Sequence, residues 1–97
     1  MKRAFWVHGV ADLQGYARAA AEFTLDERVG EIPCPLLGTM AERDPLAGGA
    51  RRFVDRLSGP ATLLGFTAAQ GAGEHCEIYN RWLLNTSALD WLDDTLA

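Results

Sequence analysis

The chain has 97 residues, of which 48% are hydrophobic, and nine Lys or Arg residues stand against thirteen Asp or Glu residues, for a net charge of -4. This length allows one domain with a modest core, and the acidic balance without any basic stripe argues against binding to nucleic acid. No apolar stretch approaches the roughly 20 residues of a membrane-spanning helix. We do not expect the positively charged N-terminus to act as a signal peptide, because His8, Gly9 and Asp12 interrupt its apolar run. We therefore expect a cytoplasmic protein with no membrane partner.

The two cysteines predict neither a cofactor nor a metal site. Cys34 and Cys76 do not form a C-x-x-C pair, and together with His8 and His75 they show no spacing that is typical of zinc ligands. In the cytosol both are expected to stay reduced. We interpret Cys34 as a core thiol and Cys76 as a packing residue.

The first third of the chain predicts one helix and then an extended approach to a strand. Apolar residues recur at helical spacing over residues 11–23, so residues 1–31 are expected to form a cap or connecting helix. Pro33 and Pro35 then favour extended backbone, because residues before proline avoid the helical region.

The middle of the chain predicts a parallel strand, helix, strand unit. Residues 36–40 and residues 61–67 are short apolar runs of the kind that are buried in parallel sheets. Between them, residues 46–58 carry one apolar stripe at helical spacing that stops at a Ser-Gly-Pro turn. A crossover of this kind joins neighbouring parallel strands.

The last quarter predicts a Gly-rich loop followed by helices. The loop covers residues 71–75, and the helices are expected over 77–84 and 87–96, with a cap at residues 85–87 between them. The residues expected in the core are Leu89, Leu92 and Leu96, together with Trp6, Trp82 and Trp91.

One acid and one histidine lie where an open parallel sheet collects its reactive groups, in the loops at the carboxyl ends of the strands. Asp44 follows the first strand and His75 follows the second, 31 residues later. Because neighbouring strands lie about 5 Å apart, the two loops can bring a carboxylate to an imidazole. The carboxylate would orient the ring, which would then be free to take a proton from a nucleophile at its other nitrogen. Taken without other information, Asp44 before proline is more typical of a plain turn, and His75 of a solvated loop.

Four segments, at residues 32–37, 41–46, 66–77 and 90–96, together resemble the C-terminal part of an α/β-hydrolase. The nearest branch is that of bacterial esterases and acyl-peptidase-like hydrolases. The resemblance covers residues 32–97 and implies a single partial domain that carries the last core strands and helices of that fold. It also implies that Asp44 is the triad acid and His75 the triad base, without a cofactor or metal.

The family's nucleophile is absent. No G-x-S-x-G elbow is present, and neither Ser58 nor Ser87 follows a strand. The chain is therefore expected to be inactive alone, as a piece of a longer hydrolase, a separately encoded part or a degenerate remnant. When completed, it would hydrolyse an ester, amide or related acyl bond of a small molecule. The alternative is a non-catalytic interaction or structural protein.

A sheet of two strands would leave apolar faces and strand edges uncovered. We therefore expect self-association or association with the rest of a hydrolase. A stable monomer in dilute solution would contradict this expectation.

Overall fold

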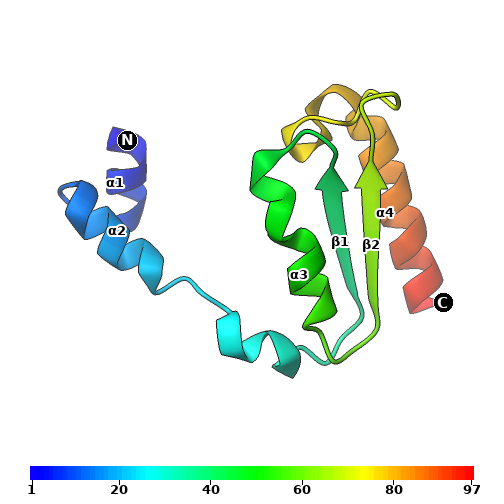
Figure 1. Cartoon of the computed structure of the whole chain (residues 1–97), viewed down its shortest axis with the longest axis horizontal. Coiled ribbons are helices and arrows are strands. Elements are labelled where there is room, and N and C mark those ends of the chain that lie inside the picture. Colours follow the sequence, from blue (N-terminus) through cyan, green and yellow to red (C-terminus); the bar gives the residue numbers. More distant parts are fainter.

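The computed structural model describes all 97 residues as a mixture of helices and strands (Figure 1). Three short 3-10 helices, η1, η2 and η3, precede β1, α3 and α4 respectively. The elements in chain order are α1 (Lys2–His8), α2 (Leu13–Ala21), η1 (Asp26–Glu31), β1 (Leu36–Ala41), η2 (Pro45–Gly49), α3 (Ala50–Asp55), β2 (Ala61–Phe66), η3 (His75–Asn80) and α4 (Arg81–Leu96).

The two strands form one parallel sheet. Their register runs from Leu36 opposite Ala61 to Ala41 opposite Phe66, so the strands start and end together. The strands predicted over 36–40 and 61–67 and their parallel pairing are confirmed. As a result, the loops that follow β1 and β2 leave from the same end of the sheet.

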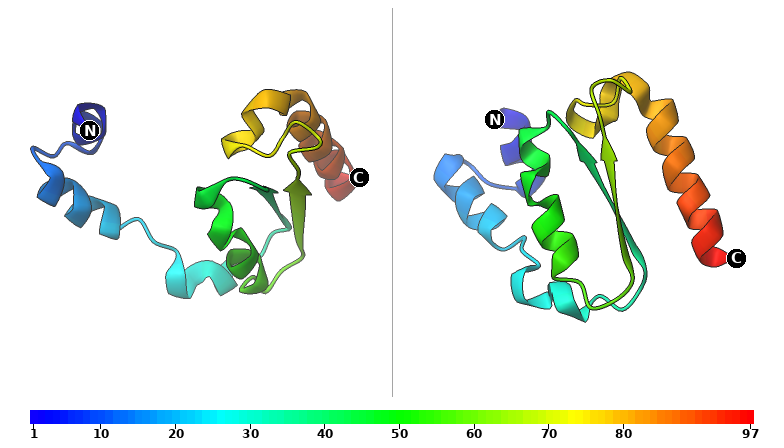
Figure 2. Two further views of the ribbon diagram at one scale, coloured as in Figure 1. Left: turned by 45° about the horizontal axis from the view of Figure 1, so that its top comes forward. Right: turned by 45° about the vertical axis from the view of Figure 1, so that its right-hand side comes forward.

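Helices cover both faces of this sheet (Figure 2). On one face, a Cβ added to Gly38 would lie 3.3 Å from Cγ2 of Val54, so this glycine lets α3 approach β1 closely. On the other face, Nε1 of Trp91 donates a hydrogen bond of 3.2 Å to Oγ1 of Thr62 and ties α4 to β2. Trp91 is thus the one tryptophan that anchors a helix to the sheet.

The helices α1 and α2, which we call the arm (residues 2–21), stand apart from the sheet and its helices (Figures 1 and 2). Aromatic contacts hold the arm together, with ring centroids 6.2 Å apart for Phe5 and Tyr16 and 5.2 Å apart for His8 and Tyr16. The Cα radius of gyration is 16.2 Å, against roughly 12.5 Å for a compact chain of this length. The expectation that Trp6 anchors the core is wrong, since it is 82% exposed.

The helix predicted over 46–58 is shorter and starts as a tighter turn. Residues Pro45–Gly49 form the 3-10 helix η2, and only Ala50–Asp55 form the α-helix α3. Pro45 suits the first turn of a helix, whereas the pair Gly48 and Gly49 disfavours regular helix. The crossover is therefore compact but irregular.

The prediction of two C-terminal helices, 77–84 and 87–96, is wrong. Residues His75–Asn80 form η3, and α4 then runs unbroken from Arg81 to Leu96. Oδ1 of Asn80 accepts a hydrogen bond of 3.2 Å from the backbone N–H of Leu83, so Asn80 caps the helix instead of residues 85–87. No glycine or proline follows it within the helix, which leaves nothing to interrupt α4.

The buried core is small. Its hydrophobic members are Val29, Ala41, Phe66 and Ala72. Other residues expected in the core are instead exposed, because α4 has no partner on its outer side. These are Trp82, Leu89, Leu92 and Leu96.

The two cysteines are free thiols, and both are exposed, so the expected packing roles are wrong. At Cys34 the backbone packs closely against the turn before β2, although the thiol is exposed. A Cβ on Gly59 would lie 3.3–3.4 Å from the carbonyl oxygens of residues 32–34. No helix is long and apolar enough to cross a membrane.

Candidate functional site

The loop after β1 fixes the carboxylate of Asp44 through its own backbone. Oδ1 of Asp44 accepts a hydrogen bond of 2.9 Å from the N–H of Leu46, and its carbonyl oxygen accepts one of 3.1 Å from the N–H of Ala47. This is the local turn that aspartate before proline favours. The turn leaves Oδ2 available for a second partner.

The loop after β2 returns across the end of the sheet and is tied to the loop after β1. The N–H of Arg43 donates to the carbonyl of Gly73 at 2.7 Å, and Oε2 of Glu42 accepts from the N–H of Ala68 at 2.6 Å. Gly71 has φ 72°, a conformation that favours glycine. A Cβ on Gly73 would lie 2.8 Å from backbone atoms of Ala68. The loop thus requires glycine at both positions, at Gly71 for its backbone conformation and at Gly73 for its close approach to Ala68.

Asp44 and His75 meet where these two loops converge. Oδ2 of Asp44 lies 2.8 Å from Nδ1 of His75. The Asp44 side chain is 8% exposed, whereas the His75 side chain is 61% exposed and makes no hydrogen bond within the chain through Nε2. The expected juxtaposition of the acid and the histidine is confirmed.

The contact with His75 also keeps Asp44 ionised. The hydrogen bond from His75 lowers the pKa of Asp44 below its usual value, against the opposing effect of burial, and the hydrogen bond from Leu46 adds to the lowering. A charged carboxylate at Nδ1 fixes the ring so that Nδ1 carries the proton and Nε2 has its lone pair free. The pair can therefore accept a proton at Nε2.

Two residues after the histidine adopt an unusual backbone conformation. Cys76 has φ 56° and Glu77 has φ 50°, the left-handed region that residues other than glycine rarely occupy. Their turn carries the chain from His75 towards α4 and buries Glu77, which is 4% exposed. Burial raises the pKa of Glu77, as does the charge of Asp44, while Arg81 and His75 oppose the rise. The sequence indicated Glu77 only as an acid at a helix start, and no motif pointed to its burial.

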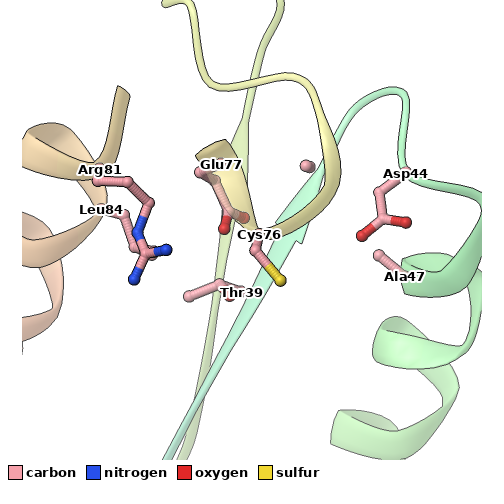
Figure 3. A pocket seen from close by; sticks show the side chains of 8 residues that line it. Thr39, Asp44, Ala47, Cys76, Glu77, Arg81 and Leu84 are labelled. Carbon is pink, nitrogen blue, oxygen red and sulfur yellow. The ribbon is translucent and has the colours of Figure 1, made fainter. Parts of the chain in front are cut away.

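A pocket of about 320 Å³ adjoins Asp44 on the α4 side of β1 (Figure 3). It lies between η2 on one side and the first turn of α4 on the other, next to the end of β1 and the turn at Cys76 and Glu77. Its lining residues are Thr39, Ala41, Asp44, Ala47, Cys76, Glu77, Arg81 and Leu84.

Neither serine of the chain lies at the pair. Oγ of Ser58 donates to the carbonyl oxygen of Gly30, just before β2 and therefore at the other end of the sheet. Ser87 lies inside α4. No group of three or more His, Cys, Asp or Glu side chains is arranged to hold a metal ion.

Comparisons of the chain with family models, curated proteins and solved structures give no match. The geometry of the site and the pattern of its residues are thus the basis for assigning a function.

Proposed function

We propose that this chain supplies the acid and the histidine of a serine-type hydrolase that acts on ester, amide or related acyl bonds of small molecules. The carrying observation is the 2.8 Å contact between Oδ2 of Asp44 and Nδ1 of His75 at the carboxyl ends of two adjacent parallel strands. The chain would represent the last core strands and helices of an α/β-hydrolase fold. The nucleophile would come from polypeptide outside these 97 residues.

In this role His75 is the general base and Asp44 its positioning partner. Nε2 of His75 takes the proton of the serine hydroxyl as the oxygen attacks the acyl carbon, and it returns the proton to the leaving group. Asp44 holds the ring and stabilises the imidazolium that forms, for which its lowered pKa suits it. Water then attacks the acyl-serine ester by the same proton transfer, which releases the acid and regenerates the serine.

The exposure of the histidine and of the sheet supports a shared site. The His75 side chain is 61% exposed, whereas acyl transfer is favoured where water is excluded and an oxyanion is stabilised. Both strands have one unpaired edge, since the sheet contains only β1 and β2. Unpaired edges favour pairing with further strands. We infer that the chain works in association, with itself or with the remainder of a hydrolase.

Activity tests this proposal at two levels. The purified chain should not turn over p-nitrophenyl acetate above the rate of His75→Ala, and a serine-directed fluorophosphonate should not label it. The assembly or longer polypeptide that contains the chain, isolated from its native host through a tag on the chain, should be labelled and active. There, Asp44→Asn should lower kcat by about 10³ to 10⁴ and His75→Ala at least as much, while His8→Ala serves as a matched control without effect.

Two results would count against the proposal. Turnover by the purified chain that His75→Ala abolishes would reveal a nucleophile within these 97 residues. A native assembly with neither labelling nor turnover would favour the other candidate, a non-catalytic interaction or structural protein. One observation favours that candidate, because the contact between Asp44 and His75 by itself joins the two loops at the end of the sheet.

A further inference from the structure

Glu77 is a buried acid without a partner. Its residue is 4% exposed, yet its carboxylate accepts no hydrogen bond and makes no ion pair within the chain. Every fully buried side-chain oxygen of the chain has a hydrogen-bond partner. Because the Glu77 oxygens have none, they must reach open space, and they do so in the pocket (Figure 3). A buried carboxylate is unfavourable unless a partner compensates its charge.

The backbone holds Glu77 in this position at a further cost. Cys76 and Glu77 are consecutive left-handed residues, and this conformation is unfavourable for residues other than glycine. The N–H of Glu77 donates a hydrogen bond of 2.8 Å to the carbonyl oxygen of Glu74, which closes this turn. Strain of this kind is concentrated at binding and catalytic sites, and here it turns an acidic side chain into a pocket instead of towards solvent.

Arg81 supplies the opposite charge in the same pocket but does not neutralise Glu77. Both side chains line the pocket and extend into the space beside Thr39 (Figure 3). No ion pair within 4.0 Å joins Glu77 and Arg81. By contrast, Glu74, three residues before Glu77, does form an ion pair, with 3.6 Å between its Oε1 and Nη1 of Arg43. Two carboxylates, those of Glu77 and Asp44, and the guanidinium of Arg81 therefore line one cavity, and Arg81 forms an ion pair with neither acid.

We propose that this pocket binds a small zwitterion, a free α-amino acid with an apolar side chain. The ammonium group would pair with Glu77, and the carboxylate would take the guanidinium of Arg81, which suits bidentate recognition. The apolar side chain would contact Leu84, which lies beside Arg81 in the cavity of about 320 Å³ (Figure 3). Binding of this kind requires no nucleophile, so it can be measured whether or not the chain takes part in hydrolysis, even though Asp44 lines the same cavity.

A set of three ligands with one hydrocarbon skeleton tests the proposal on the full chain. L-Leucine carries both charges, isopentylamine lacks the carboxylate and 4-methylpentanoate lacks the ammonium group. Amide chemical shifts of ¹⁵N-labelled protein at pH 7 report binding of each. Leucine should bind at least about tenfold more tightly than either analogue, and its shifts should be centred on Thr39, Cys76, Glu77 and Leu84.

Two variants assign the charges. Glu77→Gln should weaken leucine binding by about tenfold or more and leave 4-methylpentanoate unchanged, whereas Arg81→Gln should weaken leucine and leave isopentylamine unchanged. The exposed residues Glu22 and Arg51 provide matched controls, as Glu22→Gln and Arg51→Gln, which should bind like the unmodified chain.

Equal affinity for all three ligands would overturn the proposal, as would leucine binding that survives both substitutions in the pocket. If Glu77→Gln does not fold, Arg81→Gln and the ligand series still decide, because Arg81 is exposed on the first turn of α4.

Discussion

The sheet covers a large aromatic residue, whereas the arm leaves one exposed. Phe66, at the end of β2, is 5% exposed, while Trp6 in α1 is 82% exposed. Phe66 is covered because the two strands pair over six residues and helices flank both faces of the sheet. The arm is held by local contacts of its own, such as those of Tyr16 with Phe5 and His8. The helices of the arm thus form without a shared core. The position of Asp44 and His75, by contrast, depends on the pairing of β1 and β2.

The largest expected effect tests this difference directly. Phe66→Ala should lower the free energy of unfolding by about 3 kcal/mol or more, because it empties a large part of a small core. Trp6→Ala, an equally drastic truncation on the exposed arm, should change it by no more than about 0.5 kcal/mol. Urea unfolding followed by circular dichroism measures both. Similar shifts in the two midpoints would mean that the arm belongs to the same cooperative unit.

A smaller effect would sharpen the comparison at the site itself. Gly73→Ala should cost about 1–3 kcal/mol, since the new Cβ would lie 2.8 Å from backbone atoms of Ala68. Gly49→Ala is the matched control, because no atom lies within 4 Å of its Cβ, and it should be neutral or stabilise by up to about 1 kcal/mol. The same unfolding assay applies, and a Gly73→Ala protein as stable as the Gly49→Ala protein would show that the histidine loop is loosely packed.

The smallest effect concerns the buried charge of Glu77 in the absence of ligand. Burial raises its pKa above the usual 4.5, so the folded chain holds the proton more tightly than the unfolded chain does. Stability should therefore rise as the pH is lowered from neutral through the raised pKa towards 4.5. Asp44 opposes this only in stronger acid, because its pKa is lowered below 3.8.

Glu77→Gln should flatten this rise and stabilise the chain at pH 7 by roughly 1 kcal/mol, the low end of the cost of an unpaired buried polar group. Thermal unfolding between pH 4.5 and 7 measures it, with the exposed Glu22→Gln as the control. A pH profile that keeps its slope in the Glu77→Gln protein would assign the slope to another group.

The sites of the acid and the histidine could be predicted because their placement follows from a short-range pattern. Apolar runs set β1 and β2, and the turn chemistry around Asp44 and Gly71 set the loops after them. By contrast, the left-handed pair at Cys76 and Glu77 lies outside any propensity rule, since neither residue favours that conformation. The burial of Glu77 results from this turn and could not be seen from its position near a helix start.

Sequence alone determined the elements whose signals are local: two parallel strands, the crossover between them and an acid and a histidine at their common end. Tertiary structure decided which apolar residues are covered and how the C-terminal segment is divided. Asn85 and Ser87 were as suitable for a cap as Asn80, but α4 starts after Asn80, next to the left-handed turn at Cys76 and Glu77. Trp82 is exposed and Glu77 is buried, contrary to their residue types, because burial here depends on which elements meet in space.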